Sequence, residues 1–178
     1  MIDAVVWLMG CPAIKSVSAV MGQNHKYELG DAVASGMLTG KVSNAASFDP
    51  EEMDVEDFAS GCIKLENGGS ITFKTAWAAN LPECTEIRIS GTKAGICLPE
   101  GKVYTGSNTE VCLDAEDMEY AHPFAGHFYI IDSLREALSG KKPPLVCEQE
   151  TLTVAAILEM CYLSAKEGRE VTFCEISE

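Results

Sequence analysis

The chain has 178 residues, 47% of them hydrophobic, so it can bury one core of ordinary size and is too short for two comfortable domains. We therefore predict a single domain over residues 1–178. It contains 13 Lys and Arg and 27 Asp and Glu, and the resulting formal net charge of -14 repels nucleic acids and anionic lipids. The charge balance excludes both classes of partner.

The chain holds eight cysteines, none of them spaced as C-x-x-C, and most lie inside apolar runs. Buried thiols are the expected state for such cysteines in a chain without an export signal. The first apolar run, residues 4–10, is too short to cross a bilayer and is followed by no cleavage site. We therefore expect no membrane insertion and a cytoplasmic location.

The opening stretch, MIDAVVWLMGCP, is typical of a helix that ends at a glycine. Its apolar residues recur at helical spacing from Ile2 to Met9, Gly10 suits a left-handed stop, and Pro12 prevents continuation. Asp3 lies in the first turn, where negative charge is favoured. No capping side chain precedes the helix, so its start resembles a cut edge.

The next segments predict a strand and then an excursion. In KSVSAVMG the apolar residues Val17, Ala19 and Met21 alternate with smaller or polar ones, which indicates a strand. Residues 22–56 mix short apolar pieces with Gly, Ser and Asn. We predict that they run over the surface, with a helical turn around residues 31–37.

A hairpin is predicted in FASGCIKLENGGSITFKTAW. A three-residue loop at residues 67–69, with a glycine at positive φ, pairs Leu65 with Ile71 and Ile63 with Phe73. This register places the apolar side chains on one face and the polar ones on the other. Beyond it, short alternating segments predict a meander of strands at residues 85–98, 102–106 and 110–114.

Two helices follow, at residues 127–142 and 148–169, and a final short strand at residues 170–173. The first helix carries an apolar stripe of Phe128, Ile131, Leu134 and Leu138, and the second one of Val154, Ile157, Leu158, Cys161 and Ala165. The stripes predict that both helices cover the apolar face of the sheet. The fold class is therefore α+β, with a largely antiparallel, open-faced mixed sheet and helices packed on one face.

The opposite sheet face is polar yet includes Thr, Cys and Ala, which favours pairing with a second copy over a purely solvated surface. The sequence contains no recognisable catalytic or nucleotide-binding motif. The glycines of SGTKAG lead into a predicted strand, so they do not precede a helix N-terminus that could bind a phosphate. His122 and His127 lack further ligands at a recognisable spacing, so no metal is expected. Trp7 and Trp77 are interpreted as core or domain-contact residues.

Five stretches in order, IDAVVWLMGCPAIKSVSAV, DVEDFASGCIKLENGGSITFKTAWAAN, EIRISGTKAGI, HFYIIDSLREALSGKKPPLV and ILEMCYLSAKEGREVTF, resemble the C-terminal domain of the glucose-fructose oxidoreductase, inositol dehydrogenase and MocA family. Residues 22–47 and 105–121 match least. The resemblance implies a dihydrodipicolinate reductase-like open-sheet domain that mediates homodimerisation. In the family an N-terminal Rossmann domain binds NAD or NADP, and this cofactor domain would be absent from the chain.

The resemblance also implies where the reactive groups lie. Of the family pattern D-x-x-x-H-x-x-D only the last residue is present, as Asp3, and the histidine would fall immediately before Met1. We therefore expect no catalytic or cofactor-binding residue in the chain, which would be inactive alone. Asp3 and His122 are predicted to bind the substrate of a parent NAD(P)-dependent sugar or polyol oxidoreductase. Asp3 could instead only stabilise its helix.

Two other functions stay open at this point. The chain could be a free-standing, non-enzymatic binding or assembly module that acts through its sheet face. It could also be a fragment of a related enzyme that uses bound NAD to hydrolyse glycosides.

Overall fold

The computed structural model describes residues 1–23, 55–76, 82, 84–98, 100–106, 110–112 and 125–176. The chain divides into two compact units, Met1–Leu81 with Glu148–Glu178 and Pro82–Cys147, and each is described by itself. The prediction of one domain over the whole chain stays a prediction.

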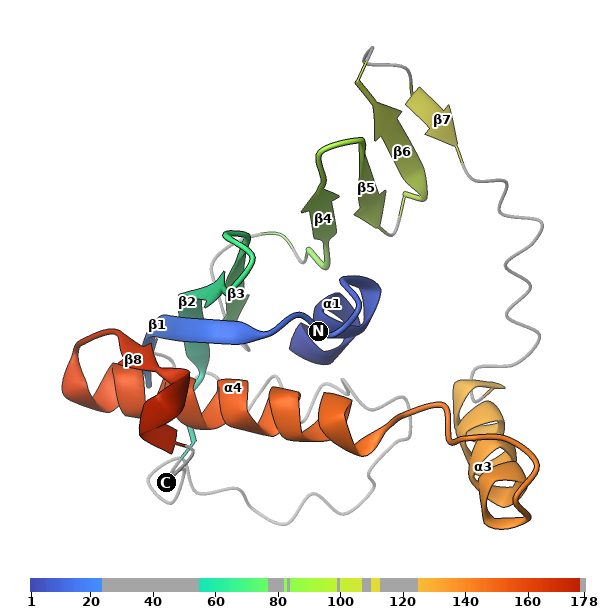
Figure 1. Cartoon of the computed structure of the whole chain (residues 1–178). Helices are drawn as coiled ribbons and strands as arrows, with labels where there is room; N and C mark the ends of the chain where they lie inside the picture. Colours follow the sequence, from blue (N-terminus) through green and yellow to red (C-terminus); the bar gives the residue numbers. More distant parts are fainter. Residues whose placement is uncertain are drawn as a thin grey trace, which may run out of the picture. The chain divides into compact units, whose positions relative to one another are not determined.

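The described part of the first unit contains two helices, a short 3-10 helix and four strands (Figure 1). In chain order these are α1 (Ile2–Leu8), β1 (Ile14–Gly22), β2 (Phe58–Leu65), β3 (Ser70–Ala76), α4 (Glu148–Glu167), β8 (Val171–Thr172) and η3 (Phe173–Ile176). The strands form sheet A in the order β3-β2-β1-β8, and every neighbouring pair is antiparallel. The expected α+β class is confirmed.

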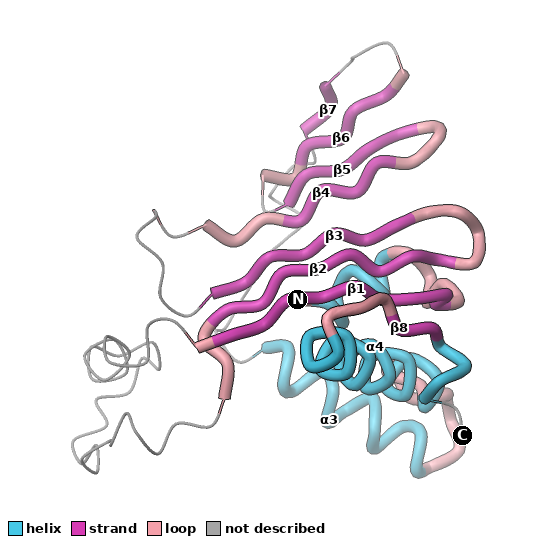
Figure 2. The backbone as a smooth tube through the Cα atoms, turned by 90° about the vertical axis from the view of Figure 1, so that its left-hand side faces the viewer, coloured by secondary structure: helices cyan, strands magenta, loops and turns pink. Residues whose placement is uncertain are grey.

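Helix α4 covers one face of sheet A (Figure 2). The strand residues that face α4 form cross-strand rows, of which Val17, Ile63 and Ile71 make the central one. Val17 and Ile63 are fully buried and Ile71 is nearly so. This alternation of buried and exposed residues along β1 is the one predicted from the sequence.

The β2–β3 hairpin keeps the predicted faces but not the predicted register. Ile63 pairs with Ile71, not with Phe73, because the three-residue loop is residues 66–68 rather than 67–69. Gly68 takes the positive φ of 84° that the loop requires. The Leu65 amide donates to the Gly69 carbonyl at 2.9 Å and closes the loop. The shift is two residues along one strand, so each side chain stays on its predicted face.

The buried stripe of α4 is rotated from the predicted one. Ile157 and Cys161 are buried as expected, but Leu158 is 44% exposed and polar Thr153 and Ser164 are buried instead. Apolar periodicity did not indicate these two polar positions, because their burial depends on hydrogen bonds. Burial raises the pKa of the Cys161 thiol to about 11, so the thiol stays protonated in the core.

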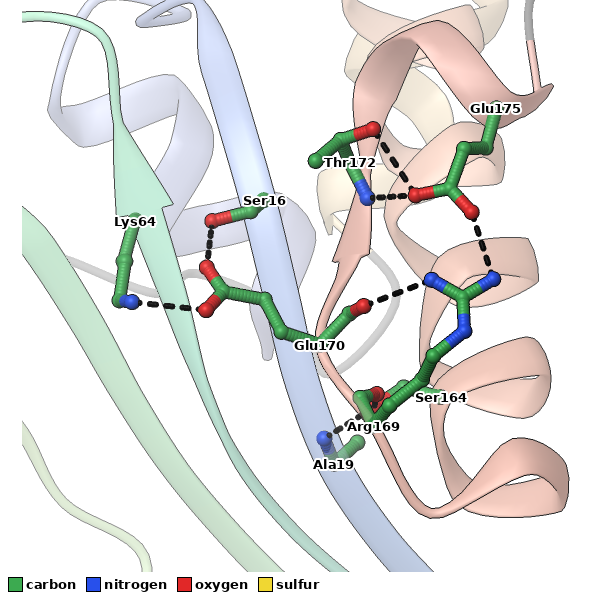
Figure 3. A network of polar contacts seen from close by, with 8 residues as sticks. All are labelled: Ser16, Ala19, Lys64, Ser164, Arg169, Glu170, Thr172 and Glu175. Atoms are coloured by element: carbon green, nitrogen blue, oxygen red, sulfur yellow. Dashed lines mark hydrogen bonds and ion pairs between the residues drawn. The ribbon is translucent and has the colours of Figure 1, made fainter.

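Ser164 extends the edge of sheet A where β8 stops. Strand β8 pairs with β1 at Ser16 and Val17, and Ala19 lies beyond this pairing. The Ser164 Oγ accepts a hydrogen bond from the Ala19 amide at 2.9 Å and donates to the Arg169 carbonyl at 2.6 Å (Figure 3). Ser164 is 1% exposed, so one hydroxyl satisfies two backbone groups in a place that water hardly reaches.

Hydrogen bonds connect the two ends of the segment that was predicted to run over the surface, residues 22–56. The Asp57 amide donates to the Gly22 carbonyl at 2.9 Å, and Gln23 Nε2 donates to the Val55 carbonyl at 2.6 Å. The predicted helical turn lies outside the described residues.

Four short strands and one helix are described in the second unit: β4 (Ile87–Ser90), β5 (Ala94–Leu98), β6 (Lys102–Thr105), β7 (Glu110–Cys112) and α3 (Ala125–Leu138). The strands form sheet B as an antiparallel meander in chain order, as predicted. In α3 the Asp132–Arg135 ion pair one turn apart forms at 3.2 Å, and Gly140 has a φ of 71° after the helix end.

The predicted apolar stripe of α3 is not covered by the other described residues of the second unit, and its packing on sheet A stays a prediction. Its four residues are more than half exposed, from 54% at Leu134 to 82% at Leu138. Tyr129 and Ile130, on other sides of the helix, are similarly exposed, so α3 is apolar around most of its surface and lacks one dominant stripe. Within the first unit, the helix that covers sheet A is α4.

Replacing Ser164 by alanine should destabilise the protein by about 1–3 kcal/mol, because the Ala19 amide would be left buried without this partner and the Arg169 carbonyl would lose its hydrogen bond. Urea unfolding followed by circular dichroism measures the change. Thr75→Val, which removes an exposed hydroxyl from β3 and keeps the branched side chain, is the control and should change stability by less than about 0.5 kcal/mol. Equal effects of the two substitutions would contradict this role of Ser164.

Candidate functional site

Helix α1 is held firmly by its inner face. Val6 is 1% exposed, and Ile2, Val5 and Met9 pack around it against the core. The helix ends as predicted at Gly10, which has a φ of 74°. These contacts fix the orientation of α1 on the first unit.

The loop after α1 is attached to α4. The Cys11 amide donates to the Val6 carbonyl at 2.8 Å, and the Cys11 thiol donates to Thr153 Oγ1 at 3.7 Å. Both ends of the helix are thus anchored by the core that α4 completes.

The outer face of α1 presents a carboxylate and an indole. Asp3 is exposed, and Trp7, one helical turn later, is 57% exposed. Residues four apart lie on the same side of a helix, so the two side chains are neighbours. Trp7 is therefore not a core residue of the first unit, and the alternative, that it contacts another domain, stays a prediction. Trp77 lies outside the described residues.

The structure places one of the two predicted substrate-binding residues. Asp3 makes no ion pair or hydrogen bond with the side chains that the structure describes, so its carboxylate is available to a ligand. His122 lies outside the described residues, and its role stays a prediction. His127 is in the first turn of α3, as expected.

A second, shallower candidate lies on sheet B. Residues of β4, β5 and β6 line an open depression of about 370 Å³. Tyr104 pairs across the strands with Gly95, and Arg88 and Ser90 lie on the same face. Glu86 receives a hydrogen bond from Arg88 at 2.6 Å and raises the pKa of the guanidinium. The depression offers binding groups but no acid–base pair.

A cluster of charged side chains at the C-terminal end of α4 connects strands and helices to one another (Figure 3). Glu170 accepts hydrogen bonds from Ser16 Oγ and, at 2.9 Å, from Lys64 Nζ, which ties the chain before β8 to β1 and β2. These two partners lower the pKa of Glu170, the Ser16 hydrogen bond most. The carboxylate is fully engaged by the fold.

Glu175 closes the second half of this cluster. One of its oxygens accepts from the Thr172 amide at 2.8 Å and from the Thr172 hydroxyl at 2.9 Å, and the other pairs with Arg169 Nη2 at 2.6 Å. Mainly through the Arg169 hydrogen bond, these contacts lower the pKa of Glu175 to about 2. We interpret the cluster as a clamp that holds β8 and η3 and not as a reactive centre.

Within the described ranges, no three His, Cys, Asp or Glu side chains come together as a metal site. Among the helices of this part of the chain, none combines the length and apolarity that crossing a bilayer requires. Two candidate surfaces are left, the outer face of α1 with its one carboxylate and the open depression on sheet B, and ligand binding at either stays a prediction.

Comparison with known proteins identifies the family. The family described as "Oxidoreductase family, C-terminal alpha/beta domain", of the glucose-fructose oxidoreductase, inositol dehydrogenase and MocA group, matches residues 1–173. The chain belongs to this oxidoreductase family. The resemblance read from the sequence is thereby confirmed over nearly the whole chain.

Members of this family that resemble the chain are about twice as long. D-glucoside 3-dehydrogenase from Escherichia coli (strain K12) is 27% identical over 174 residues, which are 96% of this chain and 46% of that protein. The chain therefore spans about half the length of this relative.

Solved structures show the same fold. An oxidoreductase from Agrobacterium radiobacter in complex with NAD⁺, L-tartaric acid and magnesium has a TM-score of 0.65 at 18% identity, over 98% of this chain and 47% of that one. Aldose-aldose oxidoreductase from Caulobacter crescentus, complexed with glycerol, has a TM-score of 0.64 at 19% identity, over 96% and 44% of the two chains.

The clamp predicts how stability depends on pH. Folding lowers the pKa of Glu175 from 4.5 to about 2, so its contribution is complete above pH 4.5 and is lost as the pH falls towards 2. Glu175→Gln removes that contribution. The urea midpoint of the unsubstituted chain should exceed that of the variant at neutral pH, and the gap should close between pH 4.5 and 2. Glu159→Gln, on the exposed side of α4, should show no such gap, and a gap independent of pH would contradict the assignment.

Proposed function

We propose that this chain is the substrate-binding and dimerisation half of an NAD(P)-dependent sugar or polyol oxidoreductase and is not catalytic by itself. One observation carries the proposal: a family match over residues 1–173 accounts for almost all of this chain but for under half of its relative's length. Hydride transfer needs a nicotinamide held beside a base that removes a hydroxyl proton. In this proposal both belong to the other half of the enzyme.

The proposed substrate class is supported by the relatives. One is named for a glucoside, and two were solved with glycerol or tartaric acid, which are small polyhydroxylated molecules. In this chain Asp3, exposed on α1, is proposed to accept hydrogen bonds from substrate hydroxyls, and His122 to approach the same substrate. The proposed partner is thus a small sugar or polyol, with NAD or NADP as the cofactor of the whole enzyme.

Calorimetric titration with NAD and NADP tests the division of labour. The chain of 178 residues should bind neither dinucleotide with micromolar affinity and should not reduce NAD in the presence of sugars. The Agrobacterium radiobacter oxidoreductase, solved with NAD⁺, is the positive control under the same conditions. Micromolar binding to this chain, or sugar oxidation by it, would contradict the proposal.

We also propose that the exposed face of sheet A pairs with a second copy. Its central row is Ser18, Cys62 and Thr72, which are small side chains on adjacent strands. Small side chains let two sheets approach closely, and a two-fold axis would set the same row against itself. The support is this flat, mixed surface on the side of the sheet opposite α4.

Thr72→Arg should dissociate the homodimer, because in a two-fold interface each introduced charge faces its own copy. Multi-angle light scattering after gel filtration measures the mass. Glu159→Arg, on the exposed side of α4, is the charge-changing control and should leave the dimer intact. A monomeric unsubstituted chain, or a Thr72→Arg dimer of unchanged stability, would contradict the proposed interface.

The cytoplasm is the proposed location of the protein. It is supported by the cysteines of the described residues, which form no disulfide bond with one another.

A further inference from the structure

The exposed side of α1 carries two large apolar side chains, Trp7 and Leu8, that differ in their distance around the helix from Asp3. At 100° per residue, Trp7 lies about 40° around the helix from Asp3, whereas Leu8 lies about 140° from it. Trp7 is therefore grouped with the carboxylate and is separated from the other large exposed side chain of the helix, Leu8, which is 40% exposed. The indole and the carboxylate form one small surface.

The spacing along the helix is that of a sugar ring. Four residues rise about 6 Å along the axis, which is close to the width of a pyranose. A carboxylate can accept hydrogen bonds from two neighbouring hydroxyls, and an indole offers a flat apolar face with an N–H at its edge. A ligand whose hydroxyls bind Asp3 would thus bring its next ring over Trp7.

The charge of Asp3 favours a small polar ligand over a dry protein contact. An apolar protein surface packed on Trp7 would also cover the carboxylate one turn away, which has no cationic partner among the described residues, unless that surface brought a cation of its own. Burying an unpaired charge is strongly unfavourable. A polyhydroxylated ligand instead leaves the carboxylate hydrogen bonded while it covers the indole.

We infer that Trp7 forms a second subsite beside Asp3, and that this subsite takes the ring-bearing aglycone of a glycoside. The inference rests on the proposed function, because it assumes that Asp3 binds the sugar. Trp7 sets the preference between glycosides and does not touch the reacting atoms.

Titration of the full 178-residue chain with methyl and phenyl β-D-glucopyranoside tests this subsite. The chain has two tryptophans, so the indole N–H resonances report binding residue by residue in NMR spectra once Trp7→Phe assigns them. Phenyl glucoside should bind about threefold to tenfold more tightly than methyl glucoside, and Trp7→Ala should abolish that preference. Leu8→Ala, a truncation elsewhere on the exposed side of α1, should leave it unchanged.

The outcomes separate the two levels of the argument. Loss of binding of both glycosides in Asp3→Asn, with the phenyl preference lost only in Trp7→Ala, supports the subsite. A phenyl preference that survives Trp7→Ala overturns the subsite and leaves the role of Asp3 intact. Absence of binding of either glycoside to the unsubstituted chain overturns both the subsite and the substrate role proposed for Asp3.

Discussion

The packing of α4 against β1 is the constraint on which the first unit depends. Ile157, Met160 and Cys161 fill the space above the central row of sheet A, and each is almost fully buried. Because sheet A has four strands among the described residues, and β8 has two residues, the sheet could not bury an apolar face without this helix. Apolar burial alone does not specify the position of α4 along β1. The hydrogen bond between Ser164 and the Ala19 amide does, because it requires one alignment of the helix with the strand.

The outer face of α1 depends indirectly on the packing of α4 against β1. Helix α1 has seven residues, too few to be stable alone, and it holds its shape because Val6 reaches the core that α4 completes. The orientation of α1 then decides which residues face outward. Asp3 and Trp7 share an exposed surface because Val6, on another side of the helix, is buried. The charge clamp at Glu170 and Glu175 acts at the other end of α4.

The sequence predicted the elements better than their contacts. The alternation of apolar and polar residues placed β1 correctly. The faces of the hairpin were also predicted correctly although its register differs by two residues, because a shift by an even number of residues leaves each side chain on the same face. The final strand was predicted over residues 170–173, but the strand stops after Thr172 and Phe173 begins η3. The α4 stripe missed Ser164, because a buried polar residue is explained by partners that are far away in the chain.

The site could be predicted only in part. Asp3 was found through the family pattern, and no periodicity distinguishes it from an ordinary first-turn acid. Trp7 was missed because a tryptophan within an apolar run is usually buried. The available signal was its position relative to the whole apolar face of Ile2, Val5, Val6 and Met9, because at 100° per residue Trp7 lies about 150° from the centre of that face. His122 lies outside the described residues, so its role stays a prediction.

The central claim, that this chain supplies the substrate half of a larger oxidoreductase, is tested most directly by sequencing the DNA upstream of the codon for Met1 in its source. The account predicts an uninterrupted reading frame that encodes a strand, a G-x-G-x-x-G turn and a helix, and that ends in a histidine codon directly before Met1. A stop codon in that frame immediately upstream would contradict the account and would favour a free-standing binding module.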